Sequence, residues 1–290
     1  MTHHPDLDQA RPHRLVPVRR VRFEWPEDLD PIWNRREPDL AIAANAVSLL
    51  MPHAEPYVVA SVRSQLPTIR DTDADLAERA TAYAAQEAQH HGQHRRFNDM
   101  LLARYPRLSM VERMTAWLFG RLRRRSTLFG LAFAAGFECI AFTAARWVDK
   151  RTRLLRGGDP TATTLFLWHL AEEVEHKSVA WEVYQSAVGP DGGGRLRYAW
   201  ATWVSGLVLA WCALVGTWVM LWHERRWWRP DAHIRLLVWS VSFIFVALPA
   251  MIVSALPGHR PDELADPAGL AHWLDNFDPE TGTVPEWAQP

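Results

Sequence analysis

Apolar positions recur at intervals of three and four residues over most of the first 188 residues, and this spacing predicts helices. No segment of useful length alternates as a strand would. Residues that favour helix ends divide the region into stretches at about 39–50, 55–66, 71–104, 109–123, 126–157 and 159–188. Because the turns between these stretches are short, the pattern favours an all-α fold built on an antiparallel helical bundle.

Several boundaries carry a specific signal. Pro52 and Pro56 should interrupt the chain before the second helix, and Asp71 or Thr72 can cap the third. Ser109 begins a Ser-x-x-Glu capping box. Further caps are expected at Ser126 or Thr127 and at Asp159, which Pro160 follows.

The pattern changes after residue 194. Residues 198–222 and 236–258 carry no charge, and each run is long enough to cross a bilayer. The connection 223–235 holds four arginines, and eight of the sixteen tryptophans lie at 200–239. We expect a hydrophobic helical hairpin that inserts into a membrane. The alternative is burial as two core helices of a soluble protein or homodimer.

Membrane topology constrains this hairpin. Arginine-rich connections normally stay on the cytoplasmic side, yet the helical body on the opposite flank should lie there too. A re-entrant or surface-lying hairpin removes the conflict. Residues 1–38 lack the apolar run of a signal peptide, so we expect a membrane-associated protein on the cytoplasmic side that is not secreted.

These patterns divide the chain into four parts. Residues 1–38 are an irregular lead-in, 39–188 the helical bundle, 189–260 the hydrophobic hairpin and 261–290 an acidic tail. The net charge of −1 gives no bulk electrostatic case for nucleic-acid binding, and no nucleic-acid motif is present. Two cysteines cannot form a disulfide framework.

Two Glu-x-x-His motifs carry the candidate chemistry. Glu87 and His90 form the first, Glu173 and His176 the second, and residues three apart share one face of a helix. One predicted helix before each motif lies another glutamate, Glu55 or Glu138, in apolar surroundings. The order Glu, Glu-x-x-His, Glu, Glu-x-x-His across four helices is the ligand set of a ferritin-like dimetal carboxylate bundle.

The charges of this set fit two divalent cations. Four carboxylates carry −4 and two neutral imidazoles add nothing, so two divalent ions balance the site. Oxygen and nitrogen ligands without thiolate suit iron first and manganese second. Zinc ranks lower because it favours four-coordinate sites with more nitrogen or sulfur.

Neighbouring residues extend the two motifs. Tyr83, His94 and His169 fall on the same helix faces and are expected as further ligands or as hydrogen-bond partners of the ligands. Glu172 competes with Glu173, because it lies four residues before His176. No catalytic residue beyond the metal site is identified by the pattern.

Three segments resemble the bacterial family labelled "predicted metal-dependent hydrolase". They are Pro52-His53-Ala54-Glu55, Gln86-Glu87-Ala88-Gln89-His90 with His94, and the block from Trp168-His169 to Val179-Ala180. The resemblance covers roughly residues 20–260 and implies metal ligation by the Glu and His positions named above. One position departs from the family pattern: Cys139 stands after Glu138 where the family usually has His.

Three functions fit this set of residues. The first is an oxygen-activating di-iron oxidase or oxygenase acting on a small apolar, lipid-like substrate, because the site adjoins the hydrophobic hairpin. The alternative is a metal-dependent hydrolase that uses a metal-bridging hydroxide. The third is a non-catalytic metal-binding protein.

Overall fold

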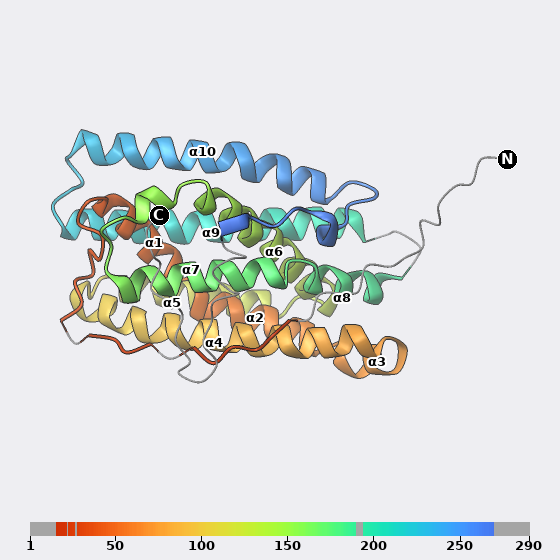
Figure 1. The fold of residues 1–290 in the computed structure, drawn as a ribbon. Helices are drawn as coiled ribbons and strands as arrows, with labels where there is room; N and C mark the ends of the chain where they lie inside the picture. Colours follow the sequence, from red (N-terminus) through yellow and green to blue (C-terminus); the bar gives the residue numbers. More distant parts are fainter. Residues whose placement is uncertain (1–15, 22, 27, 190–193, 270–290) are drawn as a thin grey trace.

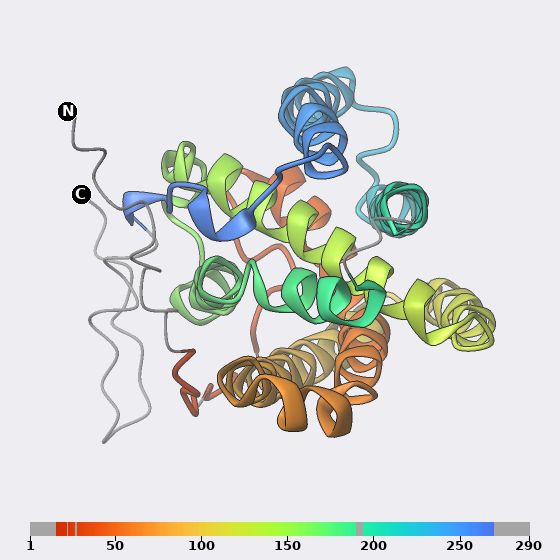
Figure 2. The same ribbon diagram turned by 90° about the vertical axis from the view of Figure 1, so that its right-hand side faces the viewer.

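The computed structural model describes residues 16–21, 23–26, 28–189 and 194–269. Within these ranges the fold is all-helical, as predicted, and a single bridge between Asn34 and Gly158 is the only β pairing. The helices are α1 (Pro38–Ser48), α2 (Met51–Arg63), α3 (Leu66–Thr72), α4 (Ala74–Arg104), α5 (Leu108–Leu122), α6 (Thr127–Asp149), η1 (Thr152–Leu155), α7 (Pro160–Glu175), α8 (Val179–Val188), α9 (Arg195–His223), α10 (Pro230–Ser254) and η2 (Pro261–Glu263). Figure 1 shows α4, α7, α9 and α10 running in nearly the same direction, and in Figure 2 α6 crosses between them at an angle.

Four helices form the bundle that positions the candidate site. Helix α2 packs against α4 and α6, and α7 packs against the same two helices from the other side. Seen almost end-on in Figure 2, α4 and α7 run side by side. The ferritin-like assignment of this bundle stays a prediction.

Two of the predicted caps are confirmed and two are wrong. Ser126 accepts a hydrogen bond from the Phe129 amide, and Asp159 accepts one from the Ala162 amide. Helix α4 is capped by Asp73 rather than by the predicted Asp71 or Thr72, which end α3 instead. Ser109 lies inside α5 and caps nothing, because Arg107 precedes the helix.

Pro56 does not break α2, contrary to the prediction. The helix begins at Met51 and passes through Pro56. A proline in a helix has no amide to donate to the carbonyl four residues earlier, here that of Pro52. Arg95 Nη2 lies 3.5 Å from this carbonyl oxygen and donates to it instead. The helix therefore continues, and Glu55 keeps its place on the buried face.

The stretch predicted as one helix at 159–188 is two helices. Helix α7 ends at Glu175, and His176 follows with φ −107° and ψ 13°, outside helical geometry. The carbonyl of His176 accepts a hydrogen bond from Val179 N, where α8 begins. His176 is thus held at a bend between two helices rather than on a regular helix face.

The N-terminal residues that the structure describes before α1 lie outside regular helices and contribute to the core. Val16, Val21 and Phe23 are buried, and the Phe23 ring packs on Trp168 of α7 with centroids 5.5 Å apart. The segment therefore covers the two helices that carry the Glu-x-x-His motifs. The predicted features at 1–15 and 270–290 lie outside the described residues.

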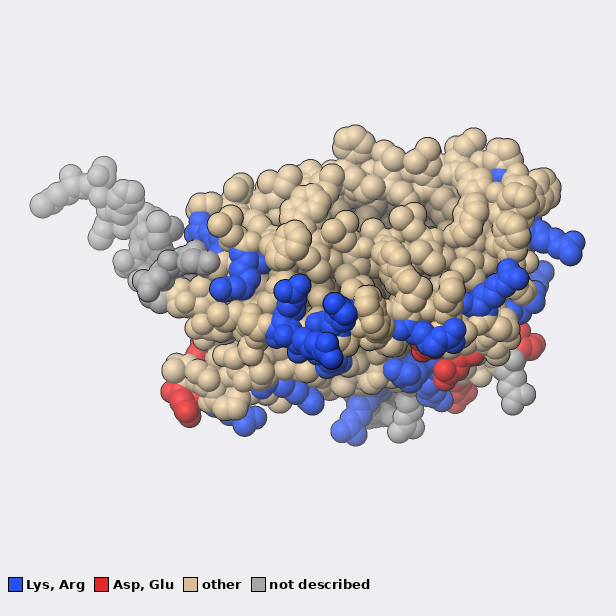
Figure 3. All heavy atoms as spheres, turned by 180° about the vertical axis from the view of Figure 1, so that it is seen from behind, with Lys and Arg blue, Asp and Glu red and all other residues tan. Residues whose placement is uncertain are grey.

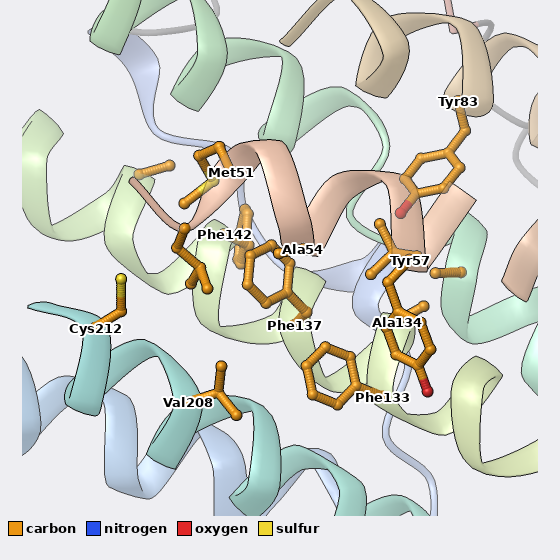
Figure 4. Packing of buried hydrophobic residues seen from close by; sticks show 14 of the residues in the cluster. Met51, Ala54, Tyr57, Tyr83, Phe133, Ala134, Phe137, Phe142, Val208 and Cys212 are labelled. Atoms are coloured by element: carbon orange, nitrogen blue, oxygen red, sulfur yellow. The ribbon is translucent and has the colours of Figure 1, made fainter. Parts of the chain in front are cut away.

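Helices α9 and α10 lie along the body. Helix α9 packs against α6 and α1, and α10 packs mainly against α6. The approach of α9 to α6 is close, since a Cβ at Gly136 would come within 2.7 Å of the Thr202 Cα. Figure 4 shows Val208 of α9 directed at Phe133 and Phe137 of α6, whereas Cys212 Sγ faces the Ala46 carbonyl oxygen of α1 at 3.6 Å.

Among the described residues, three helices, α6, α9 and α10, are long and apolar enough to cross a membrane. The three helices differ in how much of this apolar surface is buried. In the most apolar stretch, 78% of α6 is buried inside the protein, against 33% of α9 and 11% of α10. Helix α6 is therefore a core helix, whereas α9 and α10 present apolar surface to the surroundings.

Candidate metal centre

The four bundle helices bring the six predicted ligands together in the core. Glu55 comes from α2, Glu87 and His90 from α4, Glu138 from α6, and Glu173 and His176 from the end of α7. Each of these side chains is at most 1% exposed. Burying four carboxylates in one place is costly unless each finds a partner, so the cluster calls for positive charge.

The candidate ligands form two adjacent groups. Three residues make one group and four the other, seven in all, and within a group one ligand atom from each residue lies within 4.8 Å of the others. The groups are Glu55, His90 and His169, and Glu87, Glu138, Glu173 and His176. The role of these residues as ligands stays a prediction, and the geometry that it requires is present.

Glu87 and Glu173 belong to the second group, and each also lies close to a histidine of the first group. Glu87 Oε1 is 3.4 Å from His176 Nδ1 and 3.8 Å from His90 Nδ1. The two oxygens of Glu173 divide in the same way: Oε1 is 2.8 Å from His169 Nε2, and Oε2 is 3.5 Å from His176 Nε2. Carboxylates in these positions can bridge two cations.

Many polar atoms of the centre have no hydrogen-bond partner. Both oxygens of Glu55 and both ring nitrogens of His176 are buried without one. Buried polar atoms in folded proteins are rarely left unpaired. The remaining unpaired atoms at the centre are Glu87 Oε1, His90 Nδ1, Glu138 Oε2 and Glu173 Oε2. Bound cations would give these atoms partners. A carboxylate oxygen and an unprotonated imidazole nitrogen each offer a lone pair to a metal ion.

The protonation equilibria of the cluster lead to the same conclusion. Burial, and then the negative charge of Glu87, raises the pKa of Glu55 well above its ordinary value. The pKa of Glu173 is raised for the same two reasons. Without a cation these side chains would therefore take up protons, and a divalent ion would release them.

His169 and His94 were both expected either as extra ligands or as hydrogen-bond partners of ligands, and the structure places them differently. His169 Nε2 faces the first group, 2.8 Å from Glu173 Oε1 and 3.8 Å from Glu55 Oε1. His94 lies behind it, and its Nε2 is 2.7 Å from His169 Nδ1. His169 therefore belongs with the candidate ligands, and His94 with the residues that hold them.

Glu172 does not replace Glu173. Its Oε2 lies 2.9 Å from His90 Nε2, on the far side of the imidazole from the cluster. Burial alone lowers the pKa of His90, but the hydrogen bond with Glu172 and the negative charges of Glu87 and Glu172 outweigh it and raise that pKa to about 10. A carboxylate behind a histidine in this way fixes which ring nitrogen faces a metal.

Tyr83 supports the centre from α4. Its hydroxyl donates to Glu138 Oε1 over 2.7 Å, which leaves Oε2 of the same carboxylate facing the cluster. Cys139, the departure from the family pattern, points away from the site. Its Sγ faces the carbonyl oxygen of Ala250 on α10 at 3.9 Å, so the substitution leaves the candidate ligands unchanged.

Arg19 was missed by sequence reasoning. Its guanidinium donates to both oxygens of Glu175 at 2.6 and 2.9 Å and lies 3.5 Å from Glu172 Oε1. Gln86 Nε2 joins this network by donating to Glu175 Oε2 and to the Pro17 carbonyl oxygen. The one signal in the sequence was the charge of the Glu172–Glu175 segment, which needs a basic partner from elsewhere in the chain.

The comparisons with known proteins give one match. A family model described as predicted metal-dependent hydrolase matches residues 17–265, which is most of the chain and includes every candidate ligand. No curated protein and no solved structure matches the chain significantly. The family match and the buried Glu and His groups together point to a divalent metal centre. The chain belongs to the family of predicted metal-dependent hydrolases.

Proposed function

We propose that this protein is a hydrolase whose centre holds two divalent metal ions between α2, α4, α6 and α7. The observation that carries the proposal is the set of buried carboxylate oxygens and imidazole nitrogens without hydrogen-bond partners. The family assignment favours hydrolysis over the oxygen-activating chemistry expected first, which has no support from the comparisons. Iron and manganese are the metals that this oxygen and nitrogen donor set favours.

The seven candidate ligands would hold the ions, with Glu87 and Glu173 between them. A divalent ion supplies Lewis-acid activation of water and of a carbonyl or phosphoryl oxygen. The protein's own contribution is orientation. Glu172 keeps a proton on His90 Nε2, so that Nδ1 turns its lone pair to the cluster. The Tyr83 hydroxyl donates a hydrogen bond to Glu138 Oε1.

Substrate access is expected beside His169. This side chain is 7% exposed, whereas the other six candidate ligands are at most 1% exposed. A scissile ester, amide or phosphate group would therefore approach from this side. An apolar acyl group next to the scissile bond remains the predicted substrate feature.

The experiment compares metal-free and reconstituted protein. We would remove metal with a chelator, add back iron, manganese or zinc singly, and measure hydrolysis of chromogenic esters, amides and phosphate esters, together with oxygen consumption by the reduced iron form. The proposal predicts metal-dependent hydrolysis without oxygen consumption. Oxygen consumption coupled to substrate oxidation, with no hydrolysis of any ester, amide or phosphate, would overturn it.

A matched pair of variants provides the control. Glu87→Gln removes a charge from between the two groups, and the protein should lose both metal and activity. Glu78→Gln makes the same change at an exposed position of the same helix and should leave metal content and activity unchanged. Equal activity in the two variants would contradict the proposed centre.

A further inference from the structure

The outward surface of α9 is an apolar stripe. Exposed side chains follow one another at intervals of three, four or seven residues along the whole helix. Leu196 at one end is 87% exposed and Leu214 further along is 70% exposed. The stripe also includes Trp200, Leu207, Trp218 and Trp222. We call this stripe, with the exposed residues of α10, the apolar face.

Helix α10 extends the apolar face. Of its side chains only Ala232, Ala247, Met251 and Ser254 are buried, and Phe245 is 76% exposed. Figure 3 shows this side of the molecule, where Lys, Arg, Asp and Glu are nearly absent from a broad upper area. Contiguous apolar surface of this extent marks an interaction site.

A basic border runs beside the stripe. Helix α5 packs against α9, and the two axes are nearly parallel in Figure 2. Arg107, Arg113 and Arg121 are exposed at the start, middle and end of α5, and Arg124 and Arg125 follow in the next turn. Trp117 of α5 is exposed beside Arg121, whose guanidinium lies 5.1 Å from the indole centroid. In Figure 3, Lys and Arg accordingly line the lower edge of the uncharged area.

The direction of this border excludes a spanning orientation. If α9 crossed a bilayer, α5 beside it would carry Arg113 into the hydrocarbon, at a cost of several kcal/mol. If α9 lies in the membrane plane, every arginine of α5 stays at the level of the lipid headgroups. Anionic lipids attract such residues, and tryptophan favours the same depth.

The hairpin also makes polar contacts with the bundle at the connection between α9 and α10 and in the middle of α10. Arg226, in the connection between α9 and α10, binds both oxygens of buried Asp39 at 2.8 and 2.9 Å, and Arg235 adds a bond of 2.9 Å. Ser242 in the middle of α10 accepts from Trp147 Nε1 of α6. The hairpin thus lies against the bundle along its length and does not project from it.

We propose that the apolar face, bordered by the arginines of α5, docks the protein on the surface of an anionic lipid bilayer with α9 and α10 parallel to the membrane plane. The lipid tails cover the exposed leucine, valine and phenylalanine side chains, and the headgroup phosphates bind the arginines. This proposal does not depend on the hydrolase function.

The first test measures binding of the full-length, metal-loaded protein to vesicles of phosphatidylcholine with and without phosphatidylglycerol. Replacing Arg121, Arg124 and Arg125 by Glu should weaken binding to the anionic vesicles at least about 100-fold, because each basic residue near such a surface changes the binding constant about fivefold. Replacing Arg63, Arg70 and Arg96, exposed on α2, α3 and α4, by Glu makes the same charge change elsewhere and should have little effect. Equal effects of the two triple variants would overturn the proposed border.

The second test measures depth. Spin labels at Leu196→Cys, Leu207→Cys and Trp218→Cys sample the two ends and the middle of the stripe, with labelled wild type as the background for Cys139 and Cys212. A surface-lying α9 places all three labels at one shallow depth, about 5–10 Å into the bilayer. A deep Leu207 label between two shallow ends would show a spanning helix and overturn the proposal.

A second copy of the chain is the competing occupant of the face. Light scattering in the absence of lipid and detergent, followed by vesicle binding of the same sample, separates the two. A stable dimer that does not bind vesicles would overturn the proposal, because the apolar face would then be covered by protein. A monomer, or a dimer that dissociates on vesicles, supports it.

Discussion

His94 Nε2 lies 2.7 Å from His169 Nδ1, and this contact determines which nitrogen of His169 faces the carboxylates. Asn98 Nδ2 donates to the Ser48 carbonyl, which places Asn98 Oδ1 to accept from the Ser48 hydroxyl at 2.7 Å. The Ser48 proton is then committed, so Ser48 Oγ accepts from His94 Nδ1. His94 Nε2 must accept from His169 Nδ1, and His169 Nε2 keeps its lone pair.

With this tautomer, His169 Nε2 has a lone pair for a metal ion and no proton to donate. A lone pair at Nε2 and a carboxylate oxygen of Glu173 at 2.8 Å repel each other unless a proton or cation lies between them. Two neighbouring ligands of one metal ion, each about 2.1 Å from it, are separated by a distance close to this 2.8 Å. The two atoms would therefore suit neighbouring ligands of one bound ion.

Ser48→Ala is therefore predicted to weaken metal binding without removing any ligand. Its loss frees His94 and His169 to change tautomer, and removal of such supporting groups typically lowers metal affinity about 10- to 100-fold. Thr115→Val, which removes another buried hydroxyl far from the cluster, should leave affinity unchanged. Competition titration with a chromophoric chelator measures both variants. Unchanged affinity in Ser48→Ala would contradict the tautomer assignment.

Glu172→Gln should have a comparable effect through His90. The amide can still accept from His90 Nε2, but it carries no charge to strengthen the bond, so we expect roughly tenfold weaker metal binding. Glu182→Gln is the control, because Glu182 of α8 pairs with Arg79 of α4 rather than with a candidate ligand. Metal stoichiometry should stay the same in both. Complete loss of one ion in Glu172→Gln would show that Glu172 is itself a ligand.

The stability of the metal-free protein should fall as the pH rises above 7. Burial raises the pKa values of Glu55 and Glu173, and hydrogen bonding with Glu172 raises that of His90 to about 10 against the effect of burial, so the folded state binds more protons than the unfolded chain. Unfolding then becomes easier with increasing pH. The neighbouring histidines whose pKa values burial lowers are His94, His169 and His176.

These three histidines oppose the trend only near pH 7, where about a quarter of each is still protonated in the unfolded chain, and they add almost no slope at higher pH. Urea unfolding of chelator-treated protein between pH 7 and pH 9 measures the trend, and metal-loaded protein is the control. The loaded protein should show a much flatter dependence, since bound cations have already displaced the protons. The same pH dependence in both samples would contradict a cation site at these carboxylates.

Asp39→Asn should destabilise the fold where the hairpin meets the body. Asp39 is fully buried between Arg226 and Arg235. Removing its charge leaves two guanidinium groups without this negatively charged partner. Breaking such a pair costs about 3 kcal/mol. Asp231→Asn removes an exposed partner of the same Arg235 and should cost less than about 1 kcal/mol. Denaturant unfolding compares the two, and equal losses would contradict a structural role of Asp39.

The sequence was sufficient to predict the helical class. It also pointed to six residues that the fold brings together, and their role as ligands stays a prediction. Periodicity identifies helices whose buried face is long, and the Glu-x-x-His spacing places two ligands on one turn. Glu55 was identified from its apolar neighbours, although Pro56 obscured the helix around it. The capping signals at Ser126 and Asp159 were reliable because the side chain itself makes the bond.

Other features depend on contacts between distant parts of the chain. Arg19 lies 156 residues from Glu175 and sits in a segment without helical periodicity, so no local pattern connects the two. The bend at His176 is likewise not marked by a proline or glycine in the sequence around it. The choice between Glu172 and Glu173 depended on which side of the His90 ring each occupies, which spacing alone does not determine.

Anomalous diffraction from crystals of the metal-loaded protein tests the central claim most directly. We predict two peaks per chain at the absorption edge of the bound metal, one among Glu55, His90 and His169 and one among Glu87, Glu138, Glu173 and His176. Both peaks should disappear or weaken in Glu87→Gln, while Glu78→Gln should retain them. The absence of any peak in the cluster, with metal bound only at surface residues, would contradict the account.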